Sequence, residues 1–199
     1  MPTRKLTFVT DQYYHIYNRG VNREAIFFLP DNYVYLLHLL KKNIARHGLS
    51  LAAYCLMPNH YHFLLKPTRD DTVAPFMQSV FGAYTQAVNR KQGRQGPLFQ
   101  GRFRAILIDA EGYFTQLARY IHANPVLSGL TDTPQAWPYS NYQDIIGQRN
   151  GTLKNDDLVP GCFPTGEDYR LSVEGYIAEI VEDNLPGSYD APGQPRSSL

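Results

Sequence analysis

The chain has 199 residues, 43% of them hydrophobic, and a formal net charge of +1 at pH 7. This length and composition favour one folded domain with appendages over two separate domains. The first residues lack the apolar segment of a signal peptide, and no apolar run approaches the roughly 18 residues that a membrane span needs. Two cysteines, Cys55 and Cys162, fit buried thiols in a reducing compartment, so we expect a cytoplasmic protein.

Hydrophobic periodicity and turn residues predict a regular series of elements in the first 124 residues. They are, in chain order, a strand at 12–18, a helix at 31–46, strands at 49–56 and 60–66, a helix at 71–91, a strand at 98–108 and a helix at 111–124. Residues 57–59, Met-Pro-Asn, favour a turn, so the strands on either side should form an antiparallel hairpin. Pro125 disfavours helical geometry at the residue before it and should close the last helix.

The order strand, helix, strand, strand, helix, strand is that of the ferredoxin-like or split βαβ unit. The sequence thus predicts an α+β fold, in which two helices lie on one face of an antiparallel sheet. In the usual pairing, strand 12–18 lies beside strand 60–66 in the middle of the sheet. The other face is then left for a ligand or for the helix at 111–124.

The last quarter of the chain follows a different pattern. Residues 167–190 hold seven acids against a single basic residue, which suggests an acidic appendage. An amphipathic helix is predicted at 168–182, with its apolar residues at Leu171, Ile177, Ile180 and Val181. We therefore divide the chain into a main domain at 1–149, an acidic helical extension at 150–184, and a flexible tail at 185–199 that is rich in Pro, Gly and Ser.

Two histidines, His60 and His62, stand two residues apart in a run of strand-forming residues. Side chains alternate along a strand, so both imidazoles should emerge on one face, about 7 Å apart along the chain, and could bind one ion. Tyr61 and Phe63 should turn the other way, into a core. The alternative interpretation is a half-buried strand whose polar face happens to carry histidines.

Tyr120 and Asn124 lie one turn apart in the helix predicted at 111–124 and therefore share a face of it. A phenol and a carboxamide can be presented together there. Taken alone, the local pattern fits better a core tyrosine and an asparagine that ends the helix before Pro125. His122, two positions from Tyr120, points elsewhere and is left out of the candidate site.

The motifs taken together resemble the insertion-sequence 200-like single-tyrosine transposases, and within them the branch associated with repetitive extragenic palindromes. The resemblance covers roughly residues 10–147 in matching order, which makes it more specific than any one motif. It is carried by residues 14–20 (YHIYNRG), 57–62 (MPNHYH), 98–103 (LFQGRF), 120–126 (YIHANPV) and 137–142 (WPYSNY).

The resemblance implies a role for each residue of the candidate site. His60 and His62 would be the metal-binding pair, Tyr120 the nucleophile, and Asn124 the polar residue that completes the metal site, where these transposases usually carry Gln. The implied cofactor is Mg²⁺ or Mn²⁺, which suits mixed nitrogen and oxygen ligands, although two imidazoles would also attract Zn²⁺ or Ni²⁺. The implied product is a 5′-phosphotyrosine, and the extension after about residue 150 has no counterpart in the family pattern.

A basic segment without acids supplies a candidate DNA surface, because cations neutralise phosphates and aromatic rings stack on unpaired bases. Its basic residues are Arg90, Lys91, Arg94, Arg102 and Arg104. Further candidate DNA contacts outside this basic set are Arg19, Tyr13, Tyr17 and Phe99.

We therefore predict a metal-dependent single-stranded DNA endonuclease and strand transferase, which acts on a hairpin or palindromic repeat as a monomer or a homodimer. One alternative is a ferredoxin-like protein that binds DNA or RNA without cutting it. A second is a small-molecule metallohydrolase, which leaves the basic segment without a purpose. Covalent protein–DNA adducts discriminate among the three.

Overall fold

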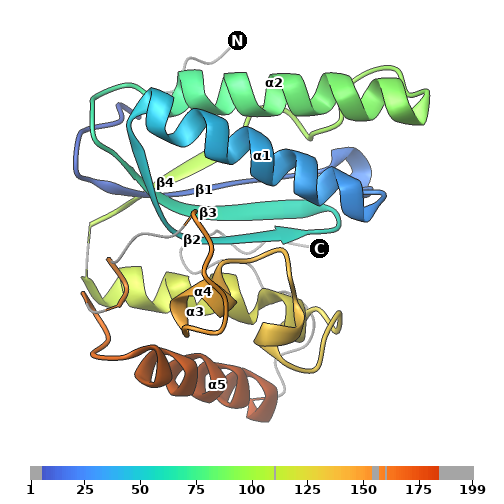
Figure 1. Cartoon of the computed structure of the whole chain (residues 1–199). Coiled ribbons are helices and arrows are strands. Elements are labelled where there is room, and N and C mark those ends of the chain that lie inside the picture. The colour runs from blue at the N-terminus through green and yellow to red at the C-terminus, as the bar shows by residue number, and fades with distance from the viewer. Residues whose placement is uncertain (1–5, 110, 154–156, 160, 184–199) are drawn as a thin grey trace.

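The chain folds into a helical layer, a sheet and a second helical layer (Figure 1). The computed structural model describes residues 6–109, 111–153, 157–159 and 161–183, so the tail predicted at 185–199 lies outside the described residues. The elements are β1 (Tyr13–Arg19), η1 (Val21–Arg23), α1 (Pro30–His47), β2 (Leu49–Met57), β3 (His60–Pro67), α2 (Val73–Gln92), β4 (Arg104–Ile108), α3 (Glu111–Leu127), η2 (Pro134–Ala136), α4 (Tyr142–Ile145) and α5 (Gly166–Glu182). Among the described residues, no helix combines the length and the apolar character needed to cross a membrane.

The sheet has the strand order β2-β3-β1-β4, and every neighbouring pair is antiparallel. The strands β1 and β3 form its central pair, and α1 and α2 lie together on one face (Figure 1). These features confirm the predicted α+β, ferredoxin-like arrangement. In the register of β1 with β3, Tyr17 lies opposite His62 and Arg19 lies opposite His60. The helix α3 covers the second face, as the prediction for residues 111–124 allowed.

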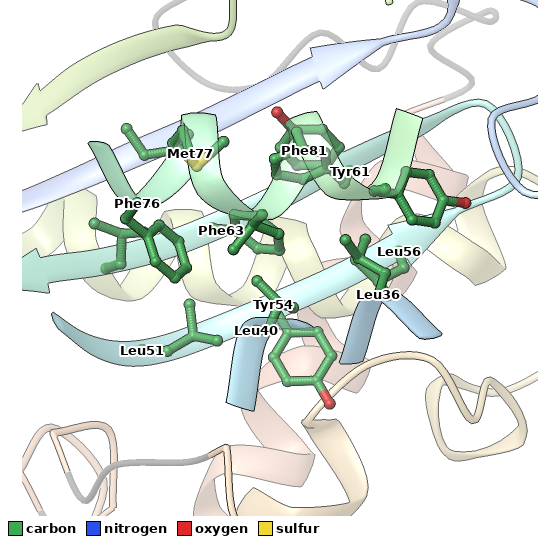
Figure 2. Packing of buried hydrophobic residues seen from close by; sticks show 14 of the residues in the cluster. Leu36, Leu40, Leu51, Tyr54, Leu56, Tyr61, Phe63, Phe76, Met77 and Phe81 are labelled. Carbon is green, nitrogen blue, oxygen red and sulfur yellow. The ribbon is translucent and has the colours of Figure 1, made fainter. Parts of the chain in front are cut away.

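Each face of the sheet has its own hydrophobic core. The first core joins α1 and α2 to the sheet, and Figure 2 shows Leu40, Phe63 and Phe76 among its members. The second core joins α3 and α5 to the opposite face and includes Leu64 and Leu117. Because β2 is covered on both faces, its sequence LSLAAYCLM is nearly continuously apolar instead of alternating. The face that carries the two histidines is therefore an interior face.

The fourth strand is shorter than the sequence predicted, because it begins at Arg104 and not at residue 98. Residues 98–100 instead run antiparallel to the end of β1, where Phe99 forms an isolated bridge with Gly20 and the Gln100 N–H donates to the Arg19 carbonyl at 2.9 Å. Gly101 follows with φ of +80°, a backbone conformation that interrupts a strand and favours glycine. The loop before β4 is thereby held against the end of the strand that pairs with β3.

The helix α3 continues to Leu127, three residues beyond the predicted end at Asn124. The residue before a proline is only biased against helical geometry, and packing outweighs that bias here. Ala123 and Asn124 are buried, and Leu127 packs against the second core. Beyond Pro125 the Ser128 N–H still donates to the Asn124 carbonyl at 2.9 Å. Asn124 thus lies inside a helix, where its side chain is held more firmly than at a frayed end.

A buried polar network ties α5 to α3 and β2. His122 on α3 contacts the Tyr169 hydroxyl through Nδ1 at 2.5 Å and Asn141 Oδ1 through Nε2 at 2.9 Å. An amide oxygen only accepts, so Nε2 carries the proton and the Tyr169 hydroxyl donates to Nδ1. Asn141 also accepts from the Tyr54 N–H at 2.7 Å and donates to the Ala52 carbonyl at 2.9 Å. His122 therefore has a structural role, consistent with its omission from the candidate site.

The buried face of α5 differs from the predicted one. Leu171 and Val181 are 54% and 60% exposed, whereas Tyr169 and Val173 are fully buried. Tyr176 and Val173 are three residues apart and pack on the same second core. Of the predicted apolar residues, Ile177 does pack against the second core, whereas Leu171 and Val181 face solvent. The prediction omitted Tyr169, whose ring is buried while its hydroxyl is paired with His122.

Replacing Tyr169 is expected to loosen α5 from α3. The substitution Tyr169→Phe leaves His122 Nδ1 unpaired in a buried site, which should cost about 1–3 kcal/mol of unfolding free energy. Tyr169→Ala adds a cavity and should cost about 3–5 kcal/mol. Urea denaturation measures both losses. Leu171→Ala on the exposed side of the same helix is the control and should change stability little; equal losses for Leu171→Ala and Tyr169→Phe would contradict the network.

Candidate active site

The two histidines of β3 share one face of the sheet and lie side by side. Tyr61 stands between them in sequence and turns the other way, where its ring stacks on Phe81 with 4.4 Å between centroids. The ring centroids of His60 and His62 lie 5.1 Å apart, at an interplanar angle of 82°. The alternation of side chains along the strand thus gathers both imidazoles at one place.

The helix α3 crosses this face and adds a phenol and an amide. The ring centroid of Tyr120 lies 5.4 Å from that of His62, with the rings almost perpendicular at 82°. Asn124 Oδ1 lies 3.2 Å from His60 Nε2. The structure therefore brings together His60, His62, Tyr120 and Asn124, the four residues that the sequence nominated for nucleophile and metal site. We refer to these four side chains as the His–Tyr cluster.

The His–Tyr cluster is accessible mainly from one end. His62, Tyr120 and Asn124 are each 4% exposed, whereas His60, the first residue of β3, is only half-buried. Arg19 on β1 is exposed and lies opposite His60 in the strand register. A substrate would therefore meet the cluster at His60, next to a cation.

Burial keeps the two imidazoles of the cluster neutral. Burial lowers the pKa of His60, an effect that the bond to Asn124 opposes and the charge of Arg19 reinforces. Burial also lowers the pKa of His62 well below its usual range, and the neighbouring His60 and His15 act in the same direction. A neutral imidazole keeps a lone pair on one ring nitrogen, which is the form that binds metal ions.

The hydrogen bonds around His60 fit a cation. His60 Nδ1 lies 2.7 Å from Asn59 Oδ1, and Asn59 Nδ2 donates to the Arg23 carbonyl at 3.1 Å, which fixes the orientation of that amide. A neutral imidazole has one N–H; donated to Asn59, it leaves the Nε2 lone pair facing Asn124 Oδ1 at 3.2 Å. Asn124 Nδ2 is buried without a hydrogen-bond partner among the described residues. A cation between Nε2 and Oδ1 would relieve the opposition of two lone pairs, as would a rotation of the amide that turns Nδ2 toward Nε2.

The His–Tyr cluster offers a metal ion two imidazole nitrogens, from His60 and His62, and one amide oxygen, from Asn124. In the part of the chain that the structure describes, no group of three His, Cys, Asp or Glu side chains is placed to hold a metal ion. Two imidazoles and one amide oxygen give a mixed nitrogen and oxygen set; the oxygen suits Mn²⁺ or Mg²⁺, and the two imidazoles would also attract Zn²⁺ or Ni²⁺.

Two residues beside the cluster were missed from the sequence, His15 and Asn59. His15 Nε2 lies 2.9 Å from His62 Nδ1. Strand alternation placed His15 on the same face as Tyr17, but only the register of β1 with β3 brings it beside His62. Asn59 was interpreted as a turn residue alone, although its position next to His60 allows its side chain to support the imidazole.

The three aromatic residues proposed as base-stacking contacts have different surroundings. Tyr17 is half-buried and stacks on the neighbouring imidazole of β1 with 4.7 Å between centroids, so it lies beside the cluster. Tyr13 packs on Phe114 of α3 at 4.5 Å. Phe99 is half-buried and meets Phe81 of the first core edge-on at 5.3 Å. Of the three, Tyr17 is the one placed next to the His–Tyr cluster.

The basic residues proposed for DNA contact divide into two groups. Lys91 is paired with Asp31 at 3.3 Å and Arg94 with Glu24 at 3.4 Å, so acids from α1 and the loop before it approach a segment that has none in sequence. The others are exposed and have no ion pair within the described ranges; they are Arg19, Arg90, Arg102 and Arg104. These four are the cations best able to meet phosphates.

Comparisons with known proteins agree with the resemblance predicted from the sequence. Residues 8–124 match the family model described as "Transposase IS200 like". A "Putative REP-associated tyrosine transposase" of Haemophilus influenzae is 27% identical over 112 residues, a match that covers 51% of this chain and 64% of that protein, just under two thirds of its length. A solved structure of a REP-associated tyrosine transposase bound to a REP hairpin has a TM-score of 0.63 at 20% identity, covers 82% of this chain and 89% of that one, and supports the fold. Because the family model spans more than half of the chain, the protein belongs to the IS200-like transposase family.

Proposed function

We propose that this protein cleaves and rejoins single-stranded DNA with Tyr120 as the nucleophile and a divalent metal ion, Mg²⁺ or Mn²⁺, held by His60, His62 and Asn124. The observation that carries the proposal is the convergence of these four side chains from β3 and α3 in a chain of the IS200-like transposase family.

The chemistry must overcome the weakness of a tyrosine hydroxyl as a nucleophile. An ordinary phenol pKa near 10 leaves about one phenolate in a thousand at neutral pH, a deficit of roughly 4 kcal/mol. A bound divalent cation supplies a positive charge that polarises the scissile phosphate. The Tyr120 oxygen forms a bond to phosphorus while the bond from phosphorus to the 3′ oxygen breaks. The phenol loses a proton, the departing 3′ oxygen gains one, and the phosphotyrosine keeps the bond energy for rejoining without ATP.

The DNA partner that we propose carries a hairpin or palindromic repeat beside its single-stranded part. A relative of the same fold is described as bound to a REP hairpin. At the accessible end of the His–Tyr cluster, Arg19 is oriented by a bond from its Nε to Gln100 Oε1 at 2.6 Å. Its guanidinium and the half-buried ring of Tyr17 are suited to a phosphate and to an unpaired base, respectively.

The direct test is the trapping of a covalent adduct. The full chain would be incubated with end-labelled oligonucleotides from its own genomic flanks, with and without Mn²⁺, and separated under denaturing conditions. The proposal expects a labelled adduct that requires Mn²⁺ and a single-stranded cleavage site, together with a free 3′-OH product. Binding without any adduct would favour the protein that binds nucleic acid without cutting it, and turnover of small phosphoesters alone would favour the metallohydrolase.

Neutralising Arg102 and Arg104 together is expected to weaken DNA binding in a salt-dependent way. About one counterion is released per phosphate contacted, so the plot of log affinity against log salt concentration should flatten by roughly one to two units. Fluorescence anisotropy at several salt concentrations measures this slope. The control is Lys41→Gln with Lys42→Gln, two exposed residues on α1. A flatter slope in the control and an unchanged slope in the arginine variant would place the DNA surface on the α1 side.

A further inference from the structure

His15 is buried in the middle of β1, and its side chain makes a single polar contact with the part of the chain that the structure describes. Its side chain is inaccessible to solvent, and its Nε2 lies 2.9 Å from His62 Nδ1. The ring stacks against Tyr17 and His62, with centroid distances of 4.7 and 5.1 Å. The other ring nitrogen, Nδ1, has no hydrogen-bond partner among the described residues. Leaving a buried polar atom unpaired destabilises a fold, so the presence of a histidine at this position needs a reason.

His122 shows how a structural histidine is buried in the same chain. Both of its nitrogens have partners, and through them it joins three elements of the fold. Among the described residues, the one hydrogen bond of the His15 side chain goes, in contrast, to a side chain on a strand already paired with its own. An aliphatic residue at position 15 would fill the same space without leaving a nitrogen unpaired. What a histidine adds at this position is the contact with His62.

The position of one proton in the His15–His62 contact decides whether His62 can bind a cation. If His62 Nδ1 donates to His15 Nε2, the lone pair of His62 Nε2 is left for a metal ion. If His15 Nε2 donates instead, a neutral His62 carries its proton on Nε2 and cannot bind through that atom. His60 has the first arrangement, with Nδ1 toward Asn59 and Nε2 toward Asn124. Metal-binding histidines generally use their second nitrogen in this way.

We infer that His15 is a positioning residue, which accepts the Nδ1–H of His62 and so keeps the Nε2 lone pair of His62 free for the metal ion. The inference rests on the proposed metal site and adds β1 to the two elements that build it. It requires a hydrogen-bond acceptor at position 15, whereas a ring of similar size without an acceptor should not suffice.

The test compares the metal affinity of the full-length wild type with that of three full-length variants by titration calorimetry with Mn²⁺. Relative to the wild type, His15→Phe keeps an aromatic ring but removes the acceptor, and its Mn²⁺ dissociation constant should rise by roughly 10–100-fold. His15→Gln offers an amide oxygen and should stay close to the wild type. Phe76→Leu in the first core is the control for lost stability without a change near the imidazoles. Circular dichroism establishes that each variant is folded at the titration temperature.

A second measurement applies to the wild type alone and needs no variant. Two-bond proton–nitrogen correlation spectra with bound Zn²⁺ should show His62 protonated on Nδ1 and His15 unprotonated on Nε2. A proton on His15 Nε2 in that state, or a folded His15→Phe protein with unchanged Mn²⁺ affinity, would overturn the role of His15 and leave the metal site standing. A wild-type protein without measurable affinity for Mn²⁺ would overturn both proposals.

Discussion

The substitution Tyr120→Phe is expected to abolish DNA cleavage and adduct formation while single-strand binding stays within a few-fold of the wild type. It removes one oxygen atom from a side chain that is 4% exposed, so little contact area with DNA is lost. The missing oxygen is the atom proposed to bond to phosphorus. The ring next to it, that of His62, carries no hydroxyl that could take over as the nucleophile. Cleavage of a labelled oligonucleotide and anisotropy binding, measured on the same preparation, separate the two effects.

Tyr113→Phe is the matched control for this experiment. Tyr113 lies on the same helix, two turns before Tyr120, and is half-buried. The control should cut DNA with substantial activity, because its hydroxyl is not proposed to react. Robust cleavage by Tyr120→Phe would remove Tyr120 from the mechanism, and loss of cleavage in Tyr113→Phe alone would transfer the role of nucleophile to Tyr113.

The sequence predicted local relationships well, because strand and helix periods fix which side chains share a face. The two-residue period placed His60 with His62, and the helical turn placed Tyr120 with Asn124. The order of elements predicted the central pairing of β1 with β3. The meeting of the two pairs of side chains depends on where α3 crosses the sheet, and that is decided by packing in the second core. No local pattern contains this information.

What the sequence did not predict comes from contacts between distant segments. The bond between His15 and His62 spans 47 positions and depends on strand register. The ion pair of Lys91 with Asp31 spans 60 positions, so a segment that is purely basic in sequence is partly neutralised in space. The extension of α3 through Pro125 reflects burial of the following turn, which outweighs a local backbone preference.

Removal of the metal ion, or of one imidazole that is proposed to bind it, is expected to reduce cleavage by orders of magnitude. Losing a residue behind a ligand already costs roughly 10–100-fold in metal affinity or activity, so losing the ligand itself should cost more. His60→Ala is the clearer variant, because His60 is half-buried, whereas His62→Ala also empties a buried site and leaves His15 without its partner. Adduct yield at a fixed Mn²⁺ concentration measures both.

Chelation separates loss of the metal from damage to the fold. Treatment of the wild-type protein with EDTA should stop cleavage, and added Mn²⁺ should restore it, because no side chain has changed. His38→Ala, at an exposed histidine on α1, is the control for removing an imidazole and should cut DNA like the wild type. Full cleavage by the EDTA-treated protein would make His60 and His62 structural, and Asn124 would then meet His60 only through a hydrogen bond. Loss that Mn²⁺ cannot reverse would mean that EDTA had acted on something other than the proposed site.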